Sequence, residues 1–362
     1  MPTSAGWRYD HNHGEWRCVE VATASTEQPV VGLDRPLRLA TLNCLHDLAQ
    51  DELLQHAIRY EAICRELQAL DADLIGLNEV TTSLLDRVLQ ADWVRRSYTV
   101  SAASHEALCS DGRFGNLLLS RIPPVSVTYI DHQPADGRRS HAMALSIRSG
   151  GDARCVVVCS THLKAFPWLM EGRRRMQLQH LTAALTTTDP ESSRPDACVV
   201  LGDFNFHRES ENASIPDGWA EMPAVAALGG TWDYGRNRML AHYLPLRNLY
   251  NGLGLGTSLA WTSPMRLDRV LVHGAALDCG AATARLFADQ PIHERARGRA
   301  PLPQAGPELR EAHRALPWEQ YLHPSDHFGI LVEIPFAAAF HPAYSCCKKR
   351  TKKASCTVPP AP

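Results

Sequence analysis

The chain has 362 residues, 44% of them hydrophobic, and a formal net charge of −2 at pH 7. This length can bury a large core, and we expect one α/β domain with tails. The near-neutral charge excludes a chain-wide basic field, so any polyanion would have to be bound by a local basic patch. No stretch approaches the roughly 18 apolar residues of a membrane span, and the N-terminus lacks the apolar core of a signal peptide. We therefore expect an intracellular protein, nuclear or cytoplasmic.

Cysteine usage agrees with a reducing compartment. The sequence contains eleven cysteines, and several of them lie inside apolar segments, where a thiol behaves as a small hydrophobic side chain: Cys44, Cys64, Cys155, Cys159 and Cys198. We predict free thiols rather than a disulfide framework.

Residues 1–36 are predicted to form an N-terminal appendage. Trp7, Tyr9 and Trp16 flank the stretch "DHNHG", a pattern typical of two short strands around a turn. The histidines of this stretch could ligate a metal ion, but we favour a solvated turn.

The predicted catalytic domain covers residues 37–336, where hydrophobic periodicity indicates alternating strands and helices. In chain order the predicted elements are a strand ending near Asn43, a helix at 51–70, a strand at 72–80, a helix at 83–94, strands at 113–123 and 154–166, a helix around 178–185, and strands at 199–209, 266–274 and 325–335. The segment 293–320, rich in Pro and Arg, is predicted to be a surface insertion. Residues 337–362 lack packing periodicity, and we expect a disordered basic tail.

Polar side chains recur at the ends of the predicted strands. They are Asn43, Glu79, His162, Asp203 with Asn205, Asp268, and Asp326 with His327. In the first four strands the polar group follows the apolar run, whereas in the last two it precedes the run. All of them can meet at one edge only if the last two strands run antiparallel to the others. A purely parallel sheet is therefore disfavoured, and mixed or antiparallel sheets flanked by helices are favoured.

These side chains offer oxygen and imidazole ligands without a cysteine pair. Such a set suits Mg²⁺ or Mn²⁺ better than zinc. Hard cations of this kind commonly act on phosphate oxygens, and histidines and amides then stabilise the charge that develops there. In the stretch "GDFNFH", Asp203 is placed to activate water and Asn205 to orient a phosphate group.

The ordered motifs "TLNCLHD", "ADLIGLNEV", "STHL", "LGDFNF", "LDRVLV" and "SDHFG" resemble those of the endonuclease/exonuclease/phosphatase superfamily over residues 37–335. The resemblance implies a four-layer α/β sandwich, with two facing sheets between helices, and Mg²⁺-dependent hydrolysis of phosphate esters.

The resemblance also implies roles for individual residues. Glu79 would bind the metal with Asn43 beside metal and phosphate, and Asp326 would be a metal-linked carboxylate. Asp203 would orient or deprotonate the attacking water, and Asn205 would hold the phosphate. His327, held by Asp268, would contact the scissile phosphate, and His162 would donate a hydrogen bond to a phosphate oxygen.

Within the superfamily, "GDFNFHRE", "TWD" and "PSDHFG" look most like the tyrosyl-DNA phosphodiesterase branch, which opens 5′-phosphotyrosyl links. Trp232 would then be a wall for the nucleotide, and His207 and Arg208 would contact phosphate. The stretch "NCLHD" is closer to deadenylase-like and RNA-processing members. The leading prediction is a phosphodiesterase acting on DNA or RNA ends. The alternatives are an RNA exonuclease, a small-molecule or lipid phosphoesterase, and a catalytically silent binding module.

Two basic stretches accompany this prediction. The arginines at 173–175, with Lys164, could form the local patch that a nucleic acid needs, or they could be a solvated helix start. The terminal "KKRTKK" at 348–353 has the composition of a nuclear signal, and the adjacent Cys346 and Cys347 also fit a lipidated tether; an inert tail is the default.

Overall fold

The computed structural model describes residues 4–20, 30–47, 51–109, 113–132, 139–149, 153–165, 168–186, 194–242, 264–293 and 316–337. Most of the predicted insertion at 293–320 lies outside the described residues. The predicted tail lies outside them from residue 338 onward, including "KKRTKK", Cys346 and Cys347.

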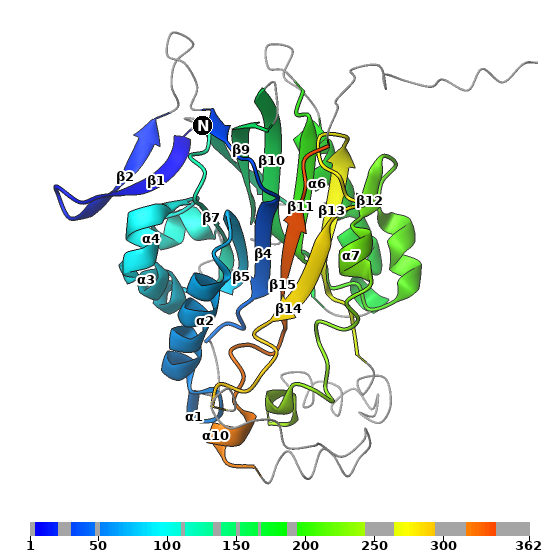
Figure 1. Ribbon diagram of the computed structural model, residues 1–362. Coiled ribbons are helices and arrows are strands. Elements are labelled where there is room, and N and C mark those ends of the chain that lie inside the picture. The colour runs from blue at the N-terminus through cyan, green and yellow to red at the C-terminus, as the bar shows by residue number, and fades with distance from the viewer. Residues whose placement is uncertain are drawn as a thin grey trace, which may run out of the picture.

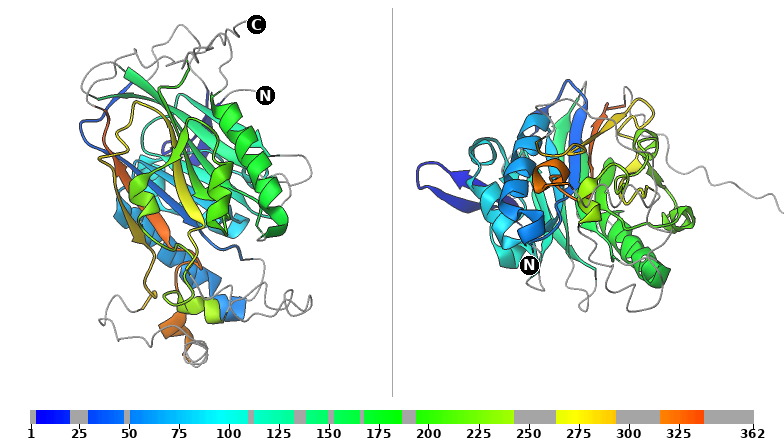
Figure 2. Two further views of the ribbon diagram at one scale, coloured as in Figure 1. Left: turned by 90° about the vertical axis from the view of Figure 1, so that its right-hand side faces the viewer. Right: turned by 90° about the horizontal axis from the view of Figure 1, so that it is seen from below.

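Within the described part of the chain, fifteen strands are linked by hydrogen bonds, and all of them except β2 and β3 form one path that folds back on itself as two facing halves (Figures 1 and 2). The first half contains, in spatial order, β12 (Trp219–Glu221), β13 (Asp268–Gly274), β11 (Ala197–Asp203), β10 (Ala153–His162), β9 (Arg139–Arg148) and β8 (Ser126–Asp131). The second half contains β6 (Thr99–Val100), β7 (Gly115–Ser120), β5 (Leu74–Val80), β4 (Leu37–Asn43), β15 (Gly329–Ile334) and β14 (Thr283–Phe287).

The strand directions confirm the prediction drawn from the polar strand ends. β4 and β5 are parallel, as are β10 and β11. β13 runs antiparallel to β11, and β15 runs antiparallel to β4. The fold is therefore a mixed α/β sandwich, and the polar ends of strands from both halves lie at the same edge.

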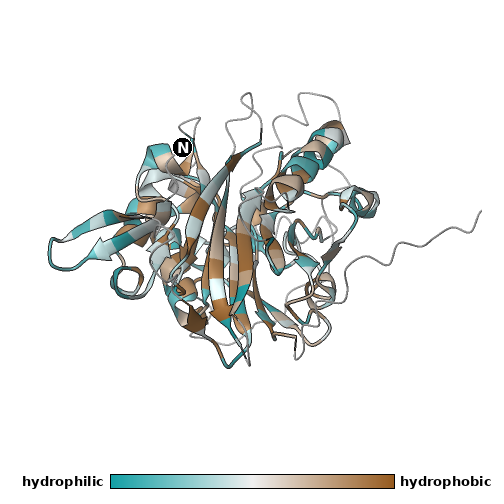
Figure 3. Ribbon diagram, turned by 90° about the horizontal axis from the view of Figure 1, so that it is seen from above, coloured by the Kyte–Doolittle hydropathy of each residue, from teal (hydrophilic) through white to brown (hydrophobic). Residues whose placement is uncertain are grey.

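Strand alternation explains the layers. In β11, Val199 and Leu201 belong to the apolar cluster between the two halves, whereas Cys198 and Val200 face outward and pack with Leu181 of α6 (Glu171–Thr186). The outer face of the other half is covered by α2 (His56–Leu70), α3 (Thr82–Gln90) and α4 (Asp92–Ser97). Brown, hydrophobic stretches run along the central strands in Figure 3. Successive side chains along a strand thus fill the inner and the outer core in alternation.

Shorter elements complete the described structure. They are α1 (Asp51–Leu54), α5 (His105–Leu108), α7 (Pro223–Ala226) and α10 (Trp318–Tyr321), with 3₁₀ turns at Trp168–Met170 (η1), Glu209–Ser214 (η2) and Arg238–Ala241 (η3). No helix among the described residues is long and apolar enough to cross a membrane.

Several boundaries differ from the sequence prediction. The helix predicted at 51–70 is divided into α1 and α2 because Gln55 adopts a left-handed conformation, with φ of 45°. The helix predicted at 83–94 is divided at Ala91, which is extended. Strands β6, β8, β9, β12 and β14 were not predicted. β9 carries buried polar residues such as Ser140 and His141, which obscure its apolar alternation.

The N-terminal residues form the predicted pair of short strands. β1 (Ser4–Asp10) and β2 (Glu15–Glu20) are an antiparallel hairpin, and β1 also pairs with β6 and β8, linking the two halves. In the turn, His13 Nδ1 lies 2.7 Å from Asp10 Oδ2. β3 (Val31–Gly32) pairs with β9. The domain boundary at residue 37 stays a prediction.

The cysteine prediction is confirmed for the part of the chain that the structure describes, where every cysteine is a free thiol. Cys44, Cys159 and Cys198 are buried in the outer cores, and burial raises the pKa of the Cys64 thiol to about 11. These thiols are therefore protonated packing groups at neutral pH.

Candidate active site

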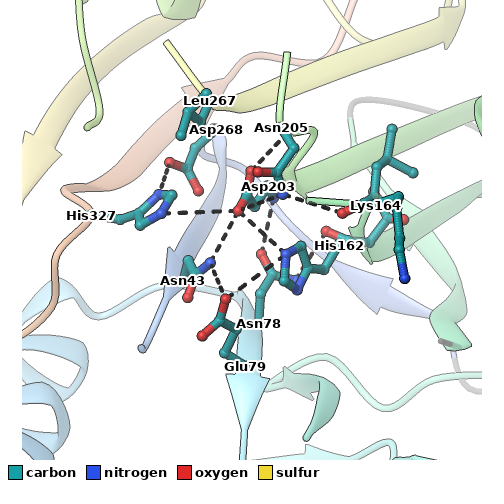
Figure 4. A network of polar contacts seen from close by, with 12 residues as sticks. Asn43, Asn78, Glu79, His162, Lys164, Asp203, Asn205, Leu267, Asp268 and His327 are labelled. Atoms are coloured by element: carbon teal, nitrogen blue, oxygen red, sulfur yellow. Dashed lines mark hydrogen bonds and ion pairs between the residues drawn. The ribbon is translucent and has the colours of Figure 1, made fainter. Parts of the chain in front are cut away.

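Backbone pairing brings the polar strand ends together. The β10–β11 register places His162 opposite Asp203, and the β11–β13 register places Asp203 opposite Asp268. Gly202 allows β11 to lie this close to β10 at the polar end, because a Cβ at residue 202 would lie only 2.0 Å from the Thr161 carbonyl oxygen. Figure 4 shows the resulting cluster, with side chains from both halves of the sandwich pointing at one another.

A local irregularity positions Glu79. The β5–β7 register shifts between Leu77 and Val80, and Glu79 takes a left-handed conformation with φ of 57°. Asn205, two residues after Asp203, is also left-handed with φ of 51°. A left-handed non-glycine residue costs on the order of 1–3 kcal/mol and persists only where the surrounding structure holds it, as at many active sites. Both conformations turn a polar side chain toward the cluster (Figure 4).

Asp203 is the centre of the cluster and is 2% exposed. Its Oδ2 accepts hydrogen bonds from Asn43 Nδ2 at 3.0 Å and Asn205 Nδ2 at 3.1 Å, and lies 3.5 Å from His162 Nε2. Burial is the main cause that raises the Asp203 pKa to about 7, and the charge of Asp268 adds to it. A carboxylate with a pKa near neutral is suited to accept a proton from water.

His327 and Asp268 form a hydrogen-bonded pair on the side of Asp203 that faces away from His162 (Figure 4). His327 Nδ1 lies 2.8 Å from Asp268 Oδ2, and His327 Nε2 lies 4.0 Å from Asp203 Oδ2. Burial opposes a charge on the imidazole, but Asp268, with Asp326 and Asp203, raises the His327 pKa well above its ordinary value. The pair therefore favours an imidazolium whose Nε2 can donate a hydrogen bond to an anionic oxygen.

Glu79 offers carboxylate oxygens on the side of Asp203 where Asn43 lies. Glu79 accepts hydrogen bonds from Asn43 Nδ2 at 3.2 Å and from the His46 backbone N–H at 3.1 Å. Burial raises the pKa of the Asp326 carboxyl, and the charge of Glu79 adds to it. Among the described residues, no group of three or more His, Cys, Asp or Glu side chains forms a complete ligand set. A site with the carboxylates of Glu79 and Asp326 fits Mg²⁺, which is usually held by one or two carboxylates and keeps several waters. It does not fit a closed zinc site.

Sequence reasoning missed the residues that hold this cluster together. Asn78 is completely buried, accepts a hydrogen bond from the Asp203 backbone N–H at 3.0 Å and donates to the Thr161 carbonyl at 3.0 Å and to Asn116 Oδ1 at 2.7 Å. Its place directly before Glu79 was a usable signal. Asn78 therefore joins the second half of the sandwich to β10 and β11 of the first.

Arg59 gave no such signal, because an arginine in a helix is usually solvated. It is fully buried and donates to the carbonyls of Cys44 at 3.0 Å, Leu45 at 2.9 Å and Pro324 at 2.9 Å. It thereby ties the loop after Asn43 to the segment that leads to Asp326 and His327.

An aromatic wall borders the Glu79 side of the cluster. The Phe114 ring stacks on His46 with a centroid separation of 5.0 Å and on His162 with a separation of 6.0 Å. His46 Nε2 and His162 Nε2 lie 3.8 Å and 3.9 Å from Glu79 oxygens. This wall orients both imidazoles toward the carboxylate.

The three predicted substrate contacts differ in how they are buried. Trp232 is 7% exposed and packs with Tyr234, Leu240 and Leu267. Burial lowers the His207 pKa to about 3, so this imidazole is neutral, and Arg208 is exposed. Their roles in substrate binding remain predictions.

The prediction of a basic patch at residues 173–175 is wrong for Arg174. Arg174 is fully buried, and its Nη2 lies 2.6 Å from a Glu211 carboxylate oxygen. Its neighbour Arg175 is exposed. The side chain at 174 belongs to the core because the inner face of α6 packs on the sheet.

A mixed α/β sandwich with a buried acid, amides and an Asp–His pair at one sheet edge has the groups that hydrolysis of a phosphoric ester requires. The family model described as the endonuclease/exonuclease/phosphatase family matches residues 40–327. The chain belongs to this family, whose members hydrolyse phosphoric esters with divalent metal ions.

Solved structures share the fold. Truncated TDP2 of Caenorhabditis elegans is 19% identical, with a TM-score of 0.54, over 83% of this chain and 97% of that one. TDP2 of Danio rerio complexed with single-strand DNA product is 16% identical, with a TM-score of 0.51, over 83% and 98%. A functionally unknown conserved protein from Enterococcus faecalis is 15% identical, with a TM-score of 0.54, over 83% and 100%. No curated protein matches the sequence significantly.

Proposed function

We propose that the protein is a Mg²⁺-dependent phosphodiesterase acting on nucleic-acid ends, with 5′-phosphotyrosyl adducts as the candidate substrate. The observation that carries the proposal is the surroundings of Asp203. Its carboxylate receives amide donors from Asn43 and Asn205, lies 3.5 Å from His162 Nε2, and faces the His327 imidazole. This combination suits attack of water on a phosphate diester.

The proposed chemistry follows from the protonation of Asp203 and His327. Asp203 accepts a proton from the attacking water, and its raised pKa places this step near neutral pH. His327, oriented by Asp268, donates a hydrogen bond to the phosphate oxygen on which charge develops. Glu79 and Asn43 would hold Mg²⁺ with Asp326 nearby, and the ion would supply Lewis-acid stabilisation of the phosphate oxygens.

Nucleic acid is the favoured substrate class for two reasons. The zebrafish TDP2 structure of the same fold is a complex with a single-strand DNA product. In this chain, Lys164 lies at the border of the cluster, two residues after His162 (Figure 4), and Arg208 is exposed three residues after Asn205. Cationic side chains at this position would neutralise the phosphates that flank a cleaved end. Such ends occur in the nucleus and the cytoplasm, the compartments we propose.

A small-molecule phosphoesterase is the second candidate. Arg174 is committed to Glu211, so the predicted patch at 173–175 has one fewer cation to offer a polyanion. A small substrate needs no extended basic surface.

The test uses matched single-stranded DNA and RNA oligonucleotides that carry either a 5′-phosphotyrosyl group or an unmodified 3′-hydroxyl end, incubated with Mg²⁺. Release of tyrosine with a 5′-phosphate left behind, absent in Asp203→Asn, supports the adduct-removing activity. Stepwise shortening of the RNA would instead assign the protein to the RNA exonuclease or deadenylase type.

A salt titration separates the nucleic-acid substrate from the small one. Binding that neutralises phosphates weakens steeply as salt rises, because condensed counterions are released. Binding of an oligonucleotide that stays flat between low and moderate salt, with hydrolysis of a small chromogenic diester, would favour the second candidate.

A further inference from the structure

The segment 231–238, which begins with the stretch "TWD", borders the Asp268–His327 pair. At its start, Thr231 is 1% exposed, and its Oγ1 accepts hydrogen bonds from the backbone N–H groups of Leu267 and Asp268, both at 3.1 Å. The Thr231 backbone N–H donates to the Met265 carbonyl at 2.9 Å. The first residue of β13, which carries the catalytic carboxylate, is therefore held by a side-chain hydroxyl.

The same segment also holds the other partner of the pair. The Thr231 carbonyl accepts the backbone N–H of Phe328 at 2.7 Å, directly after His327. Asn237, completely buried, donates through Nδ2 to the Ser325 carbonyl at 2.8 Å. Arg236 lies over the Phe328 ring, with its guanidinium carbon 4.8 Å from the centroid. The segment thus fixes the backbone on both sides of His327 and at Asp268.

We propose that Thr231, assisted by Asn237, is a positioning residue for the Asp268–His327 pair. Thr231 contacts both elements that contribute the pair, so it sets the separation of the carboxylate and the imidazole. This inference rests on the proposed phosphodiesterase activity, in which His327 donates to the phosphate. A misplacement of about 1 Å at such a group can cost about 100-fold in rate.

The decisive variants are Thr231→Val, which keeps the shape but removes the acceptor, and Thr231→Ser, which keeps the acceptor. We expect Thr231→Val to lower kcat about 10–100-fold on a phosphodiester with little change in KM, as is usual for a partner of a catalytic group. Thr231→Ser should recover most of the loss. A serine variant as poor as the valine variant would overturn the proposal, because the methyl group would then be the part that matters.

A double-mutant cycle separates positioning from general support of the fold. Asp268→Asn leaves the backbone N–H that Thr231 accepts but removes the charged partner of His327. If Thr231 acts through the pair, adding Thr231→Val to Asp268→Asn should cost little further activity. An equal loss in both backgrounds would make Thr231 a merely structural residue. Should Thr231→Val not fold, Asn237→Ala takes its place in the same cycle with the same two outcomes.

A second readout does not depend on turnover. The downfield Nδ1 proton of His327, assigned by its absence in His327→Gln, reports the bond to Asp268 in nuclear magnetic resonance spectra of the metal-free protein. It should persist in Thr231→Ser and weaken or shift in Thr231→Val; an unchanged signal in Thr231→Val would overturn the proposal. If the signal shifts as expected in a protein that cleaves no phosphodiester, the proposed function fails and the positioning role stands.

Discussion

At the scale of single residues, the site depends on a buried acid surrounded by polar donors. Asp203 is 2% exposed, yet its carboxylate accepts the side-chain amides of Asn43 and Asn205 and the backbone N–H of Asn205 at 2.8 Å. These bonds favour the ionised form, whereas burial disfavours it more strongly. The balance leaves a carboxylate that exchanges a proton near neutral pH.

The variant Asp203→Asn tests this balance through stability. Folding raises the Asp203 pKa from 3.8 to about 7, so ionising it costs folding free energy. That cost is absent below pH about 4, grows as the pH rises and is complete above pH about 7. In buffer with a chelator, we expect the melting temperature of Asp203→Asn to rise relative to the wild type across this range. A difference that stays constant with pH would contradict the raised pKa.

The variant Glu79→Gln tests the proposed metal ligand. Removing one carboxylate charge while keeping the shape should raise the Mg²⁺ concentration for half-maximal binding by about 10-fold or more, because hard cations favour charged oxygens. Titration calorimetry measures this directly, without turnover. Glu61→Gln, an exposed acid on α2, is the matched control and should bind Mg²⁺ as the wild type does. Equal affinities of Glu79→Gln and the control would remove Glu79 from the metal site.

At the scale of elements, a buried ion pair joins α6 to η2. Arg174 Nε donates to Glu211 Oε2 at 2.7 Å, and both side chains are at most 1% exposed. Glu211 Oε1 also accepts the backbone N–H of His207 at 2.9 Å. The pair therefore anchors the chain just beyond Asp203 and Asn205, where a strand end becomes a loop.

We expect Arg174→Met to lower the free energy of unfolding by about 3–5 kcal/mol, because it leaves the Glu211 charge buried without its partner. Adding Glu211→Gln should recover part of the loss, since the amide oxygen still accepts the His207 N–H. Chemical denaturation measures both. Arg175→Met, an exposed neighbour on the same helix, should change stability by no more than about 0.5 kcal/mol. A similar loss in Arg175→Met would show that the effect comes from the helix and not from the ion pair.

At the scale of the whole molecule, the site exists only where the two halves of the sandwich approach closely. Gly76 in β5 makes this approach possible, because a Cβ there would lie 2.2 Å from Leu201 Cδ1 in β11 of the facing half. Glu79 lies three residues after Gly76 in β5, and Asp203 lies two residues after Leu201 in β11. The packing of Gly76 against Leu201 thus sets the separation of the proposed metal ligand and the proposed base.

We expect Gly76→Ala to destabilise the protein by about 1–3 kcal/mol through overpacking and to lower activity as well. Leu201→Val, which shortens the facing side chain, should partly restore both in the double variant. Thermal unfolding and kcat of the variants provide the measurements. Gly32→Ala is the control, because nothing lies within 4 Å of a Cβ at that position. Simple additivity of Gly76→Ala and Leu201→Val would argue against contact between the two side chains.

The sequence alone predicted much of this arrangement. Apolar strands that end or begin with competent side chains indicated the mixed sheet and its strand directions, and β4, β5, β10, β11, β13 and β15 lie where expected. The helix interruptions at Gln55 and Ala91 were not predicted, because neither residue disturbs the apolar periodicity. β9 was not predicted because its buried Ser140 and His141 hydrogen-bond to Thr161 of β10 and to Ser101, contacts that no local pattern shows.

What the sequence determined is chemistry and order. The types of side chain at the strand ends, and their succession along the chain, indicated the reaction class, because those choices are local and periodic. Only the tertiary structure decided which groups support them. Asn78, Arg59 and Thr231 act through hydrogen bonds to backbone groups far away in the sequence, and Arg174 left the predicted basic patch for a buried carboxylate. Such bonds depend on where the chain folds back on itself, and the type of a single residue does not reveal its distant hydrogen-bond partners.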